Sequence, residues 1–209
     1  MRFSALLLAA FIGTAVAQNP TGESVGLTGP VDVFLKSDNA VSPTVLDAMR
    51  REVEAIVSPT GVRVIWSYTA DSKIYSRIAV MRLRGECISE RPPIPMRLSG
   101  SEPLGQTYVS EGRVLSFADV RCDSIRAVID RDVRAAQAGD RDELLGRAMG
   151  RVLAHELYHV LLRTTSHGRN GLARPVQTRS DLLAIHETFS PADQQKLSEA
   201  LIDDSFNQY

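Results

Sequence analysis

The chain has 209 residues, of which 44% are hydrophobic and 23% are charged, and its formal net charge is −1. This length and composition suit one globular domain with a substantial hydrophobic core. A charge this close to zero gives no general attraction to nucleic acid or to an anionic membrane surface, so neither is expected as a partner.

The first 17 residues have the layout of a secretory signal peptide. A basic residue precedes an apolar run over roughly residues 5–16, and Ala15 and Ala17 form an A-x-A cleavage site before Gln18. An ordinary buried N-terminal helix is the alternative. The run is short for a membrane span, and no later stretch reaches the roughly 20 apolar residues that a transmembrane helix needs. We therefore predict an exported protein, periplasmic or secreted, with no integral membrane segment in the mature chain.

Two cysteines, Cys87 and Cys122, are present. An even count in an exported protein favours one disulfide bond, and two separate buried thiols are the alternative. Their spacing is far from the C-x-x-C type found in zinc sites, so this pair is not expected to bind metal.

The N-terminal half of the chain predicts the order strand, helix, strand, strand. After a turn-rich flexible leader at 18–29, a single domain is expected over 30–209. Residues 30–37 alternate apolar and polar side chains, as in a strand. A helix over 42–61 should have Ser42 as its N-cap and Pro43 at its first position. Two further strands are expected at 62–68 and 77–87, where apolar or β-branched residues alternate.

The C-terminal half begins with a proline-rich segment, 88–105, which predicts a loop. Residues 106–120 suggest two strands joined by a turn at Glu111-Gly112, and 123–139 suggest a strand that continues into a short helix. The clearest helix follows, with Asp140 as N-cap and Glu143 completing a capping box. A last helix is expected at 190–201, with Ser190 as N-cap. These elements predict an α+β fold.

The helix that follows Asp140 carries the sequence "HELYH" at 155–159. His155 and His159 lie within about 40° of each other around the helix axis, on the apolar side, so they should point inward or into a cleft. Gly146 and Gly150 lie on the opposite side, where we expect close packing against the sheet. Tyr158 should lie on the far side and serve packing rather than catalysis.

Histidines at positions i and i+4 suit two ligands of a tetrahedral zinc ion. Glu156 is turned away from both and can act as the general base for a water that the metal activates, as in the H-E-x-x-H motif of zinc peptidases. The competing interpretation is a core helix whose histidines are satisfied by hydrogen bonds. That arrangement is costly, because it buries two imidazoles and a carboxylate without a partner.

A third metal ligand is required, and His167 is our first choice because the chain should turn back toward the metal just after the helix. His186 and Glu187 are rivals, since a glutamate from a second helix is the other common solution. Asp181 is a further candidate, either as a ligand or as a hydrogen-bond partner of a ligating histidine.

The order of elements and the H-E-x-x-H motif resemble the metzincin clan of zinc metallopeptidases over roughly residues 30–205. The resemblance implies a twisted, mostly parallel or mixed sheet of about four to five strands. This sheet packs on an N-terminal helix and on the active-site helix, and a C-terminal helix completes the fold. The resemblance also implies Zn2+ bound by His155 and His159, with Glu156 as base. Residues 103–117 would be the edge-strand region against which an extended substrate pairs.

Two departures from the metzincin pattern are visible. In H-E-x-x-H-x-x-G-x-x-H the glycine position holds Leu162 and the third histidine position holds Thr165, so His167 comes two residues late. No methionine follows Met149, so the methionine-containing turn of that clan is missing. The string "HELYHVLLRTTSHG" is similar to that of an uncharacterised group of small exported bacterial proteins with a protease motif.

The sequence therefore predicts a zinc metallopeptidase, an endopeptidase acting on peptide or protein substrates, with His155, His159 and His167 as metal ligands and Glu156 as the catalytic base. A non-catalytic domain of an exported protein, stabilised by metal or binding peptides, is the alternative function. A structural or adhesive export without metal is a third possibility.

Overall fold

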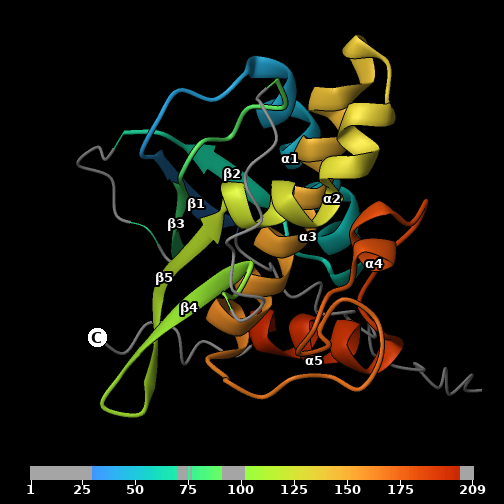
Figure 1. Ribbon diagram of the computed structural model, residues 1–209. Helices are drawn as coiled ribbons and strands as arrows, with labels where there is room; N and C mark the ends of the chain where they lie inside the picture. The colour runs from blue at the N-terminus through green and yellow to red at the C-terminus, as the bar shows by residue number, and fades with distance from the viewer. Residues whose placement is uncertain (1–29, 70–74, 76, 91–101, 203–209) are drawn as a thin grey trace, which may run out of the picture.

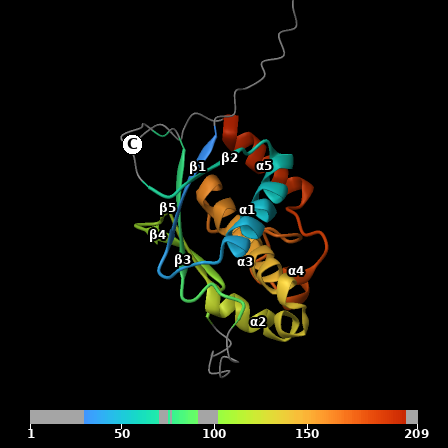
Figure 2. The ribbon, with the colours of Figure 1, turned by 90° about the horizontal axis from the view of Figure 1, so that it is seen from above.

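The computed structural model describes residues 30–69, 75, 77–90 and 102–202. A five-stranded mixed sheet in the order β2-β1-β3-β5-β4 forms one layer, and the helices of the described residues cover one of its faces (Figures 1 and 2). The α+β architecture predicted from the sequence is confirmed. The expected signal peptide at 1–17, the leader at 18–29 and residues 91–101 of the expected loop lie outside the described residues.

Four strands of the sheet are parallel, and the edge strand β4 runs antiparallel to β5. The β4–β5 hairpin turns at Glu111 (φ 51°) and Gly112 (φ 75°), the two left-handed residues that a tight two-residue turn requires, at the predicted position. The strands are β1 (Val31–Ser37), β2 (Val64–Ser67), β3 (Ile78–Arg84), β4 (Gly105–Ser110) and β5 (Arg113–Arg121).

The helices form the second layer, with α3 at its centre and α1 and α2 beside it (Figures 1 and 2). None of the helices among the described residues is long and apolar enough to cross a membrane. The helices are α1 (Pro43–Val57), α2 (Cys122–Ala135), α3 (Ala138–Leu162), α4 (Arg179–Leu183) and α5 (Pro191–Ile202), with a short 3-10 helix, η1 (Ser58–Thr60), after α1.

Helix α3 packs against α1 through two glycines. A Cβ atom on Gly146 would lie 2.5 Å from the backbone oxygen of Val45, and one on Gly150 would lie 2.7 Å from that of Met49. The expectation that these glycines pack against the sheet is wrong, because α1 lies over that side of α3. The absence of side chains lets the two helix backbones approach closely.

Two further expectations about the helices are corrected. Residues 122–135 form one helix, α2, and not a strand leading into a short helix, because Ile125, Ile129 and Val133 recur at helical spacing and are all buried. Helix α3 begins at Ala138 with Gln137 as N-cap, so Asp140 is not the cap but lies in the first turn. The sequence also gave no sign of α4, a five-residue helix inside a polar segment.

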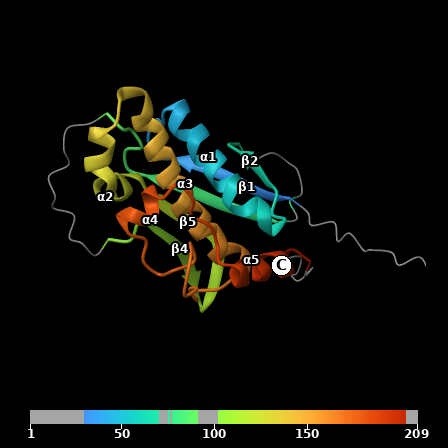
Figure 3. The same cartoon turned by 90° about the vertical axis from the view of Figure 1, so that its right-hand side faces the viewer.

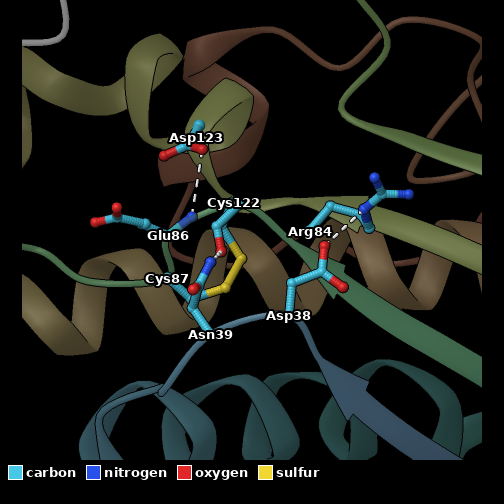
Figure 4. The surroundings of a disulfide bond; sticks show 8 residues. Asp38, Asn39, Arg84, Glu86, Cys87, Cys122 and Asp123 are labelled. Carbon is cyan, nitrogen blue, oxygen red and sulfur yellow. Dashed lines mark hydrogen bonds and ion pairs between the residues drawn. A yellow bond between two sulfur atoms is a disulfide. The ribbon is translucent and has the colours of Figure 1, made fainter.

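Cys87 and Cys122 are joined by a disulfide bond, as expected (Figure 4). Cys87 follows β3 and Cys122 begins α2, so the bond ties the end of β3 to the start of that helix. Around it, the Asn39 side chain donates to the carbonyl oxygen of Gly85, and Asp123 accepts a hydrogen bond from the Glu86 backbone.

Helix α5 packs across the C-terminal part of α3 (Figures 1 and 3). Ser190 is its N-cap, as predicted: the Ser190 hydroxyl accepts a hydrogen bond from the backbone N–H of Asp193. Tyr158, on α3, is buried, its ring stacks on Phe189 and its hydroxyl donates to Asp193, so it packs away from the histidines' cleft as expected.

Candidate metal centre

Three histidine side chains converge where α3 ends. His155 and His159 lie one turn apart on the helix, and His167 comes from the segment that follows it. One possible ligand atom from each of the three lies within 4.8 Å of the others. The structure therefore brings together the three histidines that the sequence proposed as metal ligands.

The rival ligands lie elsewhere. Among the described residues, neither His186, Glu187 nor Asp181 belongs to this cluster. Asp181 instead caps α4 through Thr178 and forms an ion pair of 2.6 Å with Arg174. Neither histidine of α3 uses it as a hydrogen-bond partner, so that suggested role for Asp181 is not observed.

The chain turns toward His167 through a left-handed residue at the end of α3. The helix ends at Leu162, and Arg163 adopts φ 48° and ψ 40°, with its N–H directed at the carbonyl groups of His159 and Val160. The turn thus begins one residue after the position at which the metzincin spacing has its glycine. Both the turn and the third histidine, His167, therefore come later in this chain than in the metzincin pattern.

Backbone carbonyl groups fix the tautomers of the two helix histidines. His155 Nδ1 lies 2.7 Å from the carbonyl oxygen of Leu172, and His159 Nδ1 lies 2.8 Å from that of Thr164. A carbonyl oxygen can only accept, so each Nδ1 carries the hydrogen and each Nε2 presents a lone pair. The metal ligands of zinc proteins are commonly held in this way.

The two Nε2 atoms, of His155 and His159, face each other at 3.1 Å. With both Nδ1 atoms protonated, no hydrogen of a neutral ring lies between them, and burial lowers the pKa of His155 to about 4, which disfavours a second proton there. Two facing lone pairs repel each other, and a cation placed between them and the third imidazole would bind to both. These residues therefore fit a metal ion such as zinc.

Glu156 lies beside the histidines and is held between α3 and β4. Its Oε2 accepts a hydrogen bond of 2.7 Å from the Thr107 hydroxyl. A Cβ atom on Gly105 would lie 2.5 Å from Glu156 Oε1, so a side chain at this position would displace the carboxyl group. Burial raises the pKa of Glu156 to about 7, against the opposing effect of the Thr107 hydrogen bond.

A cleft of about 540 Å³ opens over these groups. Its walls come from β4 and the β4–β5 hairpin on one side and from residues 164–177 on the other, and Val128 of α2 and Val152 of α3 add apolar surface. Among the described residues β4 pairs with β5 alone, and its residues Gly105–Thr107 line the cleft, so its other edge lies at the cleft. His155, Glu156, His159 and His167 all line the same cleft.

The sequence did not identify several residues that build this site. Gly105 and Thr107 were expected within the substrate-pairing region 103–117, but not as neighbours of Glu156. The backbone carbonyl groups of Thr164 and Leu172 could not be recognised from their side chains. Comparison of the chain with family models, with curated proteins and with solved structures finds no match. The function is therefore argued from the geometry of the site.

Proposed function

We propose that the chain is a zinc-dependent metallopeptidase, an endopeptidase that hydrolyses peptide bonds in extended polypeptide substrates. The observation that carries this proposal is the convergence of three imidazoles beside a buried glutamate in one cleft. His155, His159 and His167 would hold the zinc ion. When bound, zinc would supply a Lewis acid that polarises the peptide carbonyl and acidifies water.

Glu156 is the general base of the proposed reaction. It accepts a proton from the attacking water and returns that proton to the nitrogen of the departing amine, so the glutamate ends each cycle unchanged. A pKa of about 7, raised by burial, suits a group that must both take and give a proton near neutral pH. The Thr107 hydroxyl and the close approach of Gly105 keep its carboxyl group oriented toward the cleft.

Strand β4 would align the substrate. The edge of β4 away from β5, which pairs with no other strand in the described part of the chain, would offer backbone donors and acceptors to an extended peptide, and this peptide would bind as an additional strand. The histidines and Glu156 line the same cleft as residues 102–107, so a peptide bound there lies beside them.

The alternative is a metal-stabilised or peptide-binding domain without turnover. A closed structural zinc site would need a fourth protein ligand. In the described part of the chain the cluster contains three histidines and no carboxylate, which favours a site with an open coordination position. The disulfide and the predicted signal peptide support an oxidising location, the periplasm or the exterior.

The decisive experiment measures bound zinc per chain and the hydrolysis of an unfolded protein, for the wild type and for Glu156→Gln. We expect zinc in both proteins, and a loss of activity of about 10²–10⁴-fold in the variant, the usual contribution of a general base. Absence of zinc from the wild type would refute the metal site. Equal activity in both proteins would favour the alternative function.

A matched pair of histidine variants tests the third ligand. His167→Ala should lose zinc, while His186→Ala, which changes an exposed histidine outside the cluster, should retain it. The reverse result would reassign the third ligand to His186.

A further inference from the structure

The segment that follows α3 and carries His167 packs against residues 188–193. The Leu172 N–H donates to the carbonyl oxygen of Thr188 at 2.9 Å, and Gly171 pairs with Phe189 in an isolated antiparallel bridge. Leu172 is also the residue whose carbonyl group orients His155. The position of the histidine segment thus depends on the start of α5.

Asp193 lies at the centre of this support and is 2% exposed. A Cβ atom on Gly168 would lie 2.5 Å from Asp193 Oδ2, so the carboxylate abuts the backbone of the residue that follows His167. The Gly168 N–H in turn donates to the carbonyl oxygen of Ala173 at 2.8 Å, which closes the loop 168–173 directly after His167.

The same carboxylate is also bonded to the active-site helix. The Tyr158 hydroxyl donates to Asp193 Oδ1 at 3.1 Å, and the Tyr158 ring lies edge-on to His159, with centroids 5.6 Å apart. Ser190 donates to Oδ2 at 2.6 Å and Lys196 lies 2.9 Å from Oδ1. One buried carboxylate therefore joins α3, α5 and the His167 segment.

We infer that Asp193 is a positioning residue for the third histidine: by holding Tyr158 on one side and the backbone at Gly168 on the other, it fixes His167 relative to His155 and His159. This inference rests on the proposed metal site. A carboxylate that served only as the third residue of a helix cap would need no contact with α3 and no burial. Groups hydrogen-bonded directly to a metal ligand contribute about 10- to 100-fold to metal affinity; Asp193 lies one contact further out, so we expect an effect at the lower end, about tenfold.

The test compares Asp193→Ala, Tyr158→Phe and, as a control, Gln195→Ala by zinc affinity, measured by competition with a chelator on folded protein. We expect zinc to bind about tenfold more weakly to Asp193→Ala, and about threefold more weakly to Tyr158→Phe, which keeps the ring and removes one hydrogen bond. Gln195→Ala changes an exposed residue of α5 whose side chain donates to Glu199 on the same helix, and it should leave zinc affinity unchanged.

Hydrogen exchange of the metal-free proteins gives a second readout. Asp193→Ala and Tyr158→Phe should speed amide exchange over residues 164–173, whereas Gln195→Ala should leave exchange over these residues unchanged. Unchanged zinc affinity and unchanged exchange in Tyr158→Phe would overturn the inference, even if Asp193→Ala fails to fold. A wild type without zinc would refute the proposed function, and the exchange data would still decide whether Asp193 fixes the segment.

A double variant distinguishes a direct contact between Gly168 and Asp193 from a general loss of stability. Gly168→Ala alone places a methyl group against Asp193 Oδ2 and should weaken zinc binding. Adding Asp193→Ala removes the atom that the methyl group meets, so the two effects should be less than additive. Strict additivity would contradict a direct contact between the two positions.

Discussion

The N-terminal half of α3 packs on α1 at Gly146 and Gly150, whereas its C-terminal half turns His155, Glu156 and His159 toward the cleft. Both halves contain buried residues, but the first brings backbone against backbone at its glycines and the second buries groups that can ionise. Burial of the first kind stabilises the fold through close packing. Burial of the second kind costs stability in the metal-free protein, and buried ionisable groups with shifted pKa values are typical of reactive sites.

The largest effect on stability should come from a substitution in the N-terminal half of α3, which packs on α1. Gly146→Ala would place a methyl group 2.5 Å from the Val45 backbone oxygen and 2.6 Å from the Ala48 Cβ, so α1 and α3 must separate. We expect the free energy of unfolding to fall by about 3 kcal/mol, at the upper end of overpacking effects. Denaturant unfolding measures this. Zinc affinity of the folded variant should be unchanged, and a large loss of affinity would show that the two halves are not independent.

The C-terminal half of α3, called the reactive half below because it carries His155, Glu156 and His159, should make the stability of the protein depend on pH. Burial lowers the pKa of His155 from 6.5 to about 4 and raises that of Glu156 from 4.5 to about 7. As the pH falls through 6.5, the unfolded chain binds a proton at His155 that the folded protein does not, so stability falls. As the pH rises from 4.5 to 7, the folded protein keeps a proton on Glu156 that the unfolded chain releases, so stability also falls.

Glu156→Gln removes the second of these effects. In the metal-free protein, the stability gained by this substitution should therefore grow by about 3 kcal/mol between pH 4.5 and pH 7.5. Urea unfolding in the presence of a chelator at the two pH values measures the change. A gain that is the same at both values would mean that Glu156 ionises normally in the folded protein.

The features that could be predicted from the sequence are those with a local signal. The strands at 30–37 and 106–120 follow from alternation, and α1 from its cap and its apolar stripe, because these signals are local. The shared face of His155 and His159 follows from helix geometry alone. The choice of His167 rested on its place just after the helix, and the structure brings it to the other two.

The features that sequence reasoning missed depend on contacts between distant segments. The partner of Gly146 is α1, about 100 positions earlier, and no local pattern distinguishes a glycine that faces a helix from one that faces a sheet. The carbonyl groups of Leu172 and Thr164 orient the histidines through backbone atoms that every residue has. Asp193 was not singled out from the sequence, because its burial and its hydrogen bond to Tyr158 appear only after folding.

Thr107→Val tests the contact between the reactive half of α3 and β4. The substitution removes a hydrogen bond of 2.7 Å that favours the charged form of Glu156, so the pKa of that carboxyl group should rise further. The acid limb of the pH profile of kcat/KM should move to higher pH, with a loss of about tenfold near neutral pH. Thr107→Ser keeps the hydroxyl and should retain the profile. An identical shift in both variants would point to packing rather than to the hydrogen bond.

The smallest effect should come from a third glycine of α3, which lies beyond the contact with α1. A Cβ atom on Gly139 would meet nothing within 4 Å, and the residue lies in the first turn of the helix. Gly139→Ala should therefore raise the free energy of unfolding by about 0.5 kcal/mol, because alanine loses less backbone freedom on folding. Gly112→Ala is the matched control: space is equally open there, but φ is +75°, so it should destabilise the protein. If alanine raises the free energy of unfolding at Gly139 and lowers it at Gly146, then contact with α1, and not helix position in itself, makes glycine necessary in this half of α3.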